Sequence, residues 1–93
     1  SMGFHLSGVK TLAIARNGAA AVAPDSETIR NGSYPWSRPL YIYVNKAPGK
    51  PLEPLTRAFL RQAISPQGQA LVKQAGYLPL SDKQLREAQM LLE

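Results

Sequence analysis

One segment of this chain, residues 39–45, carries apolar side chains on both of its faces. In the run Pro-Leu-Tyr-Ile-Tyr-Val-Asn, Leu40, Ile42 and Val44 fall on one face of an extended strand, and the two tyrosines fall on the other. A strand that is apolar on both faces is typical of the centre of a sheet, where other layers cover it on both sides. The chain has 93 residues, which is enough for one small domain. We therefore expect this strand to need strand neighbours on both sides.

The N-terminal part offers candidates for those neighbours. Short strands are predicted at 4–6 and 9–14, and an Asn-Gly turn signal follows the second. A short helix is predicted over 24–31, because a proline and two acidic residues open it and a glycine follows it.

Three helices are predicted in the C-terminal part. The first spans about 52–64 and carries an apolar stripe. Ser65 and Pro66 begin the second as N-cap and first helical residue. Ser81 begins the third, with Gln84 completing a capping box. Together with the strands, these helices predict an α/β fold that has a short mixed sheet and three C-terminal helices.

The charge of the chain is positive but dispersed. Eleven basic and six acidic residues give a net charge of +5. No run of basic residues occurs, and aromatic residues do not alternate with basic ones as on a nucleic-acid-binding face. We interpret the charge as ordinary solvated surface and expect no nucleic-acid partner. No apolar run approaches the roughly 20 residues of a membrane span, so membrane insertion is not expected either.

Residues able to perform catalysis are scarce. His5 is the only histidine and there is no cysteine, so the sequence predicts no metal site. The acidic residues mostly lie at helix starts or on helix surfaces, where the helix dipole explains them. No serine stands in a Gly-x-Ser-x-Gly motif, and no glycine-rich phosphate loop is found. The sequence therefore predicts that the chain is not an enzyme and holds no cofactor.

The most unusual stretch, residues 29–46, admits two interpretations. On its residues alone it is a helix-to-strand connection stiffened by two prolines. It also resembles a segment of the bacterial phosphate-binding receptors, the solute-binding proteins of ABC transporters, which is written G-x-Y-P-x-S-R-P-L-Y-I-Y-V-N. Further similar motifs follow the order of that family: V-K-x-L-x-I at 9–14, S-x-x-G-Q at 65–69 and G-Y-x-P-L at 76–80.

This resemblance implies a partial periplasmic-binding-protein-like fold from the C-terminal part of such a receptor. Family members have two lobes and about three times this length, and they bind inorganic phosphate between the lobes before delivering it to a membrane permease. The resemblance makes residues 1–33 a remnant of the second lobe and 34–93 the C-terminal part of the first. Tyr34, Pro35 and Trp36 then lie at an interlobe crossing.

The resemblance also implies a periplasmic location, although no signal peptide is visible in this chain. Ser1 and Met2 resemble the remnant of an expression tag, so we expect the natural N-terminus, with any export signal, to be missing. The family binds phosphate mainly through a Ser-Gly-Thr-type motif at a helix N-terminus, and that motif does not occur here.

Ser37 and Arg38 are the candidate ligand-binding residues. Arg38 can donate a forked pair of hydrogen bonds to an oxyanion. The alternative is that Arg38 pairs with a local carboxylate or carbonyl at the start of the predicted strand.

Two functions compete on these observations. In the first, the chain is a receptor segment in a truncated form that does not bind phosphate alone. In the second, it is a small protein–protein interaction module derived from such a receptor. Because the predicted strand at 39–45 needs partners, we expect a homodimer or higher oligomer that buries it.

Overall fold

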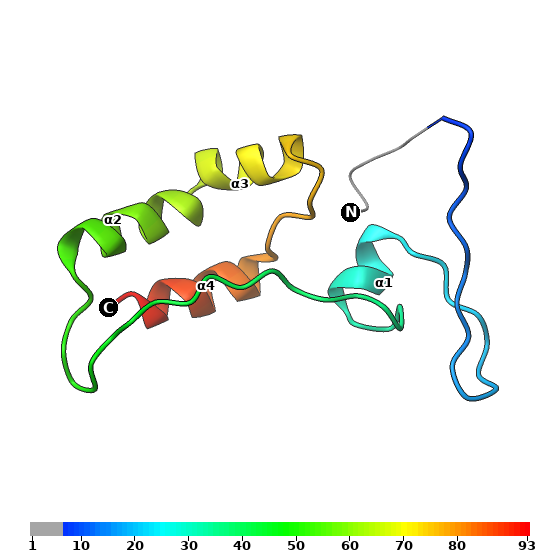
Figure 1. Ribbon diagram of the computed structural model, residues 1–93, viewed down its shortest axis with the longest axis horizontal. Helices are drawn as coiled ribbons and strands as arrows, with labels where there is room; N and C mark the ends of the chain where they lie inside the picture. The colour runs from blue at the N-terminus through cyan, green and yellow to red at the C-terminus, as the bar shows by residue number, and fades with distance from the viewer. Residues whose placement is uncertain (1–6) are drawn as a thin grey trace.

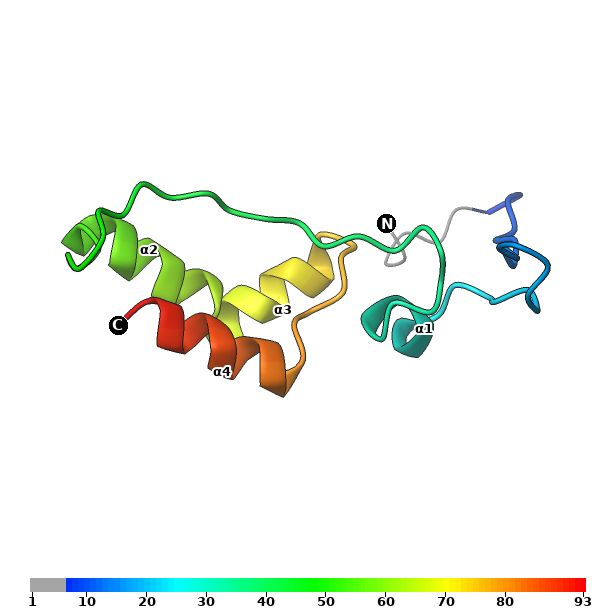
Figure 2. The same ribbon diagram turned by 90° about the horizontal axis from the view of Figure 1, so that it is seen from below.

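The computed structural model of the chain describes residues 7–93, and it is helical. A short helix, α1 (Ser26–Arg30), lies at one end of the molecule. The other end is built from α2 (Pro54–Ala63), α3 (Pro66–Gln74) and α4 (Asp82–Leu91). Helix α4 runs back beside α2 and α3, so that the C-terminus lies near the start of α2 (Figures 1 and 2).

Each of the three C-terminal helices begins at a capping residue, and for α3 and α4 it is the residue that the sequence predicts. Ser65 accepts a hydrogen bond from the Gly68 amide at the start of α3, and Ser81 forms the predicted capping box with Gln84 at the start of α4. At α2 the carboxylate of Glu53 takes the cap position. These side chains satisfy amides that the helix itself leaves without acceptors, and the three predicted C-terminal helices are therefore present.

The predicted sheet is wrong. Within residues 7–93 the only β pairing is an isolated antiparallel bridge between Ile14 and Val22, whose two backbone hydrogen bonds are both 2.9 Å long. The predicted strand 9–14 contributes only its last residue to this bridge. The predicted strand 4–6 lies outside the described residues.

Residues 39–45 are likewise not a strand. They run as an extended line along the length of the helical part, without a neighbouring strand in the described chain (Figure 2). The side chains of Leu40 and Tyr43 are 68 % and 89 % exposed. Alternation of side chains indicates which faces a strand has, but a strand forms only when another segment accepts and donates its backbone hydrogen bonds. No segment among residues 7–93 does so here.

The molecule has very little core. Among the described residues only two large apolar side chains are buried, those of Leu52, just before α2, and Leu92, at the end of α4. The radius of gyration is 16.4 Å, whereas a compact chain of this length has a value of about 12 Å. The described part of the chain is thus an open arrangement of short helices rather than a closed globule.

Helices α2 and α3 pack closely at the junction between them. Gly68, in the first turn of α3, is buried against the backbone carbonyls of Gln62 and Ala63 at the end of α2. The side-chain amide of Gln69 donates to the Ala63 carbonyl at 2.9 Å and accepts from the Leu80 amide at 2.8 Å. The Gly-Gln pair of the S-x-x-G-Q motif therefore holds α2, α3 and the segment before α4 together.

Candidate functional site

The predicted interlobe crossing at 34–36 is a turn built on the end of α1. The Tyr34 amide donates to the Thr28 carbonyl at 3.0 Å, and the Ser37 amide donates to the Tyr34 carbonyl at 3.1 Å. Thr28 itself is fixed by the α1 cap, in which it exchanges hydrogen bonds with Asp25. The turn is thus positioned by α1.

A second contact joins this turn to the N-terminal part of the chain. The guanidinium of Arg16 donates to the Pro35 carbonyl at 3.1 Å. Arg16 lies between the two residues of the β-bridge, so the bridged loop and the turn are held together. Trp36, at the centre of the turn, leaves 72 % of its surface exposed.

The two candidate ligand residues, Ser37 and Arg38, lie in different surroundings. The Ser37 hydroxyl donates to the Tyr34 carbonyl at 3.0 Å and is half-buried. Its hydrogen is therefore engaged in the turn. Arg38 is exposed and makes no hydrogen bond or ion pair within the described residues. Their role in binding a ligand stays a prediction.

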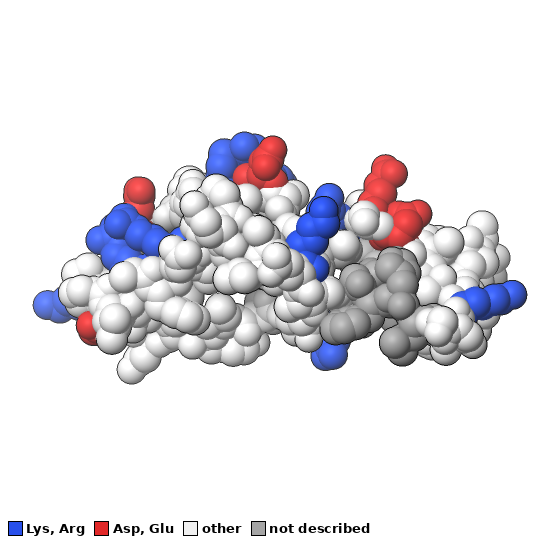
Figure 3. Space-filling view, turned by 90° about the horizontal axis from the view of Figure 1, so that it is seen from above, with Lys and Arg blue, Asp and Glu red and all other residues white. Residues whose placement is uncertain are grey.

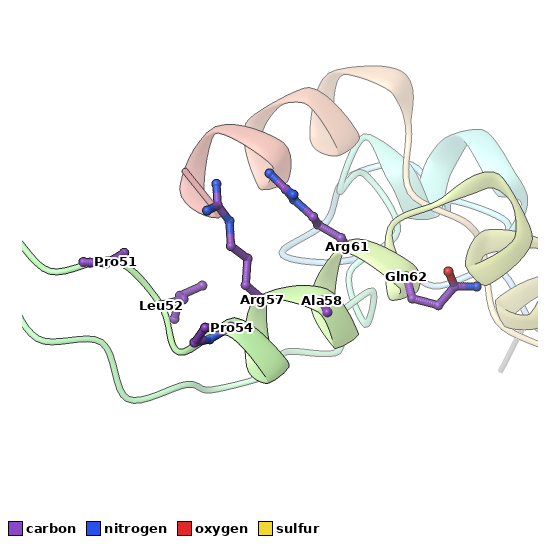
Figure 4. Close-up of a pocket in the computed structure, with 7 residues that line it drawn as sticks. All are labelled: Pro51, Leu52, Pro54, Arg57, Ala58, Arg61 and Gln62. Carbon is purple, nitrogen blue, oxygen red and sulfur yellow. The ribbon is translucent and has the colours of Figure 1, made fainter.

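A groove lies instead at the other end of the molecule, beside the first turns of α2 (Figure 4). It is open and has a volume of about 730 Å³. Its lining residues come from α2 and the segment before it: Pro51, Leu52, Pro54, Arg57, Ala58, Arg61 and Gln62. The lining is apolar except for two arginines and one glutamine.

The two arginines stand one helical turn apart on the same side of α2. Arg57 and Arg61 both extend from α2 toward α4 (Figure 4), as expected for residues spaced four apart. The Nε atom of Arg57 is buried and has no hydrogen-bond partner. Sequence reasoning missed this pair. The signal is the spacing Arg-x-x-x-Arg within the predicted helix 52–64. The prediction of that helix rests on its apolar stripe alone and does not use its charged residues.

No carboxylate in the described chain neutralises these arginines. The single ion pair within residues 7–93 joins Lys83 and Glu87 on the exposed side of α4, at 3.9 Å. The nearest acid along α2, Glu53, is engaged as the N-cap, and hydrogen bonds from the Leu55 and Thr56 amides hold the pKa of its carboxyl below the usual value. The groove is therefore an apolar surface that carries uncompensated positive charge.

The remaining charges do not form a continuous basic face. In the view of Figure 3 the lysine and arginine side chains stand in separate places with uncharged surface between them. Among the described residues no cluster of acidic residues, histidine or cysteine is arranged to hold a metal ion. The described helices are all too short or too polar to cross a membrane.

The chain is similar to phosphate-binding proteins over nearly its whole length. It is 47 % identical over 88 residues to the phosphate-binding protein PstS of Pseudomonas aeruginosa strain PAO1. The matched residues make up 94 % of this chain and 27 % of the relative. It is 37 % identical over 90 residues to the phosphate-binding protein PstS 2 of Streptococcus agalactiae serotype V, covering 97 % of this chain and 28 % of the relative. No family model matches the chain.

The resemblance predicted from the motifs is confirmed by these matches. The chain spans about a quarter of the length of the relatives that it matches. Because those relatives are binding proteins, the prediction that this chain is not an enzyme is also confirmed.

Proposed function

We propose that this chain, a segment of the phosphate-binding protein family corresponding to its C-terminal part, is a supporting element of a phosphate receptor and does not bind phosphate by itself. The observation that carries the proposal is the 47 % identity over 94 % of the chain to a phosphate-binding protein. In this proposal residues 1–33 belong to the second lobe and 34–93 to the first, with Tyr34, Pro35 and Trp36 at the crossing.

The surface of the chain supports a role within a larger assembly. The chain exposes 7722 Å², whereas a compact protein of its 10.1 kDa mass exposes about 5300 Å². The excess, about 2400 Å², is roughly three times what one partner buries in a typical protein–protein interface. Large side chains such as Tyr41 and Phe59 are among the exposed ones. A surface of this kind requires further protein to cover it.

The helix starts explain why the chain alone should not capture phosphate. An anion binds at a helix N-terminus through free backbone amides. At α2 the amides of Leu55 and Thr56 already donate to the Glu53 carboxylate, whose negative charge also repels an anion. At α3 and α4 the hydroxyls of Ser65 and Ser81 serve as caps. The α2 start therefore offers no vacant anion site, and at α3 and α4 the caps already occupy one first-turn amide each, those of Gly68 and Gln84.

The remaining steps of the receptor's work belong to the whole protein in this proposal. Phosphate capture uses residues outside this chain, delivery is to the permease of an ABC transporter, and the compartment is the periplasm. Ser37 and Arg38 remain candidate cleft residues of that whole receptor.

The second candidate function is a small protein–protein interaction module. It is favoured by the exposed aromatic residues of the crossing and the extended segment, among them Trp36 and Tyr43. The homo-oligomer predicted from residues 39–45 is a separate matter from this alternative. Neither the relatives nor the structure of residues 7–93 provides support for that oligomer, and it stays a prediction.

Co-expression distinguishes the two functions. The part of the P. aeruginosa relative that this chain does not match is produced with and without the chain, and phosphate binding is followed by isothermal titration calorimetry. We expect no heat of phosphate binding from the chain alone, and binding by the reconstituted pair. Micromolar phosphate affinity of the chain alone contradicts the proposal. A chain that forms a stable dimer and does not associate with the complementary part favours the interaction module.

A further inference from the structure

The two arginines of the groove repel each other in the chain as it stands. Arg57 and Arg61 are four residues apart on α2, and like charges at this spacing destabilise a helix. Both point to the same side, toward α4 (Figure 4). No acid within residues 7–93 pairs with either of them, so the described chain does not compensate this repulsion.

The buried part of Arg57 adds an independent indication. Its Nε atom is excluded from solvent and has no acceptor within the described chain. A buried donor without an acceptor is unfavourable, and a guanidinium is the donor group that best matches a carboxylate, through two parallel N–H···O bonds. The Nε atom of Arg57 therefore needs an acceptor that the described chain does not supply.

The lining of the groove indicates what kind of molecule carries that acceptor. Pro51, Leu52, Pro54 and Ala58 give the groove an apolar floor and rim. A free phosphate ion would leave this apolar surface uncovered and would find no backbone amide, because those at the start of α2 are capped by Glu53. An acidic side chain on an otherwise apolar protein surface would satisfy the arginines and cover the apolar lining together.

We propose that the groove formed by residues 51–62 receives a carboxylate side chain from a protein surface that packs over α2 and the end of α4. The carboxylate accepts hydrogen bonds from Arg57 and neutralises Arg61. This inference rests on the proposed function, in which the covering surface belongs to the part of the receptor that this chain does not contain. The excess exposed surface of about 2400 Å² relative to a compact chain provides ample area for such packing.

The test measures association of the chain with the complementary part of the P. aeruginosa relative. Wild type is compared with Arg57→Gln, Arg61→Gln and the control Arg86→Gln, which removes one positive charge from an exposed position of α4. We expect Arg57→Gln to weaken binding by about ten-fold or more, as for truncation of one member of a buried charge pair. The control should change binding by less than about two-fold, as expected for an exposed charge.

A second readout separates loss of binding from loss of folding. Because Arg57 and Arg61 repel each other, Arg61→Gln should leave the helical circular dichroism of the chain alone unchanged or increased while it weakens the complex. If Arg61 had only a structural role, Arg61→Gln would lower both the helical circular dichroism of the chain and its binding to the complementary part. Arg57→Lys keeps the charge without the forked donor, and we expect binding intermediate between wild type and Arg57→Gln.

Each other outcome overturns the inference in a recognisable way. If the wild-type chain does not bind the complementary part, the proposed function fails and the inference fails with it. If it binds and Arg57→Gln behaves like the control, only the inference fails. Displacement of the Arg57 Nε resonance by inorganic phosphate would assign the groove to a free anion. Self-association of the chain that Arg57→Gln abolishes would assign it to a second copy.

Discussion

Replacing Gly68 by alanine should reverse the usual effect of this substitution. In the interior of an exposed helix, alanine is more favourable than glycine by about 1 kcal/mol. In α3 an added Cβ would collide with the carbonyls of Gln62 and Ala63, which are backbone atoms at the end of α2. Flexible side chains can yield to a new methyl group, but these carbonyls can yield only if the two helices separate.

The magnitude follows from the two opposing contributions. Overpacking a close contact costs about 1–3 kcal/mol, and separation of the helices would also break the hydrogen bond from Gln69 to the Ala63 carbonyl, worth about 1 kcal/mol. Against the propensity gain of about 1 kcal/mol, we expect a net destabilisation of the α2–α3 junction by about 1–3 kcal/mol. The population of the closed junction should fall roughly five-fold or more.

Two measurements check this expectation. Amide hydrogen exchange and Cα chemical shifts over residues 54–74 report the closed junction in the whole chain. A peptide spanning 65–76 serves as the matched control, because it contains α3 without the α2 carbonyls. The substitution should raise helicity in the peptide and lower protection in the chain. If the substitution raised helicity in the peptide and also raised protection in the chain, Gly68 would not be confined by α2, and the proposed packing would be wrong.

Three further outcomes are expected. Lowering the pH should unwind the starts of α1 and α2. Hydrogen bonds from backbone amides lower the folded-state pKa values of the Asp25 and Glu53 carboxyls. The stabilisation that these carboxylates give is therefore present above the unfolded pKa and is lost as the pH falls through the lower folded value. Circular dichroism at 222 nm should show this loss below about pH 4, and Glu53→Gln should diminish it. Replacing Gln69 by Ala should cost about 1–2 kcal/mol at the junction, since both of its hydrogen bonds are lost; unchanged exchange of the Leu80 amide would contradict this. The free energy of unfolding should depend weakly on urea, with an m-value about three-quarters of that usual for 93 residues. Relative to its unfolded form the chain buries about 6900 Å² of surface, whereas a compact chain of the same mass buries about 9300 Å². A full-sized m-value in a monomer would show that the chain closes into a compact fold.

The parts of the fold that could be predicted from the sequence are those determined locally. A helix start needs only a capping residue and the next few amides, so Ser65, Ser81 and Gln84 identify their helices without knowledge of the rest of the molecule. Gly76 follows the end of α3 and has a φ of 85°, and glycine is the residue that most often takes this left-handed conformation after a helix.

The sheet could not be predicted in the same way, because a strand depends on segments that are distant in the sequence. The alternation at 39–45 indicates correctly that both faces are apolar, yet it does not indicate what covers them. Within residues 7–93 nothing pairs with this segment, and its side chains stay exposed. The candidate site shows the same limit: the Arg57–Arg61 spacing is readable in the sequence, but the missing acceptor at Arg57 Nε emerges only once the packing is known.

The exposed apolar segment and the unpaired arginines are two aspects of one physical situation. Folding of a chain of this size is favourable only if enough apolar surface is buried to offset the conformational entropy of ordering it. Here Leu52 and Leu92 are the only large apolar side chains buried among the described residues, while the best-formed interactions are caps and the Gly68–Gln69 junction, which act locally. Local interactions can maintain helices, but they cannot provide a core. The covering protein that we propose would supply both the apolar contacts and the acid for Arg57, and the same association would therefore complete the core and neutralise the groove.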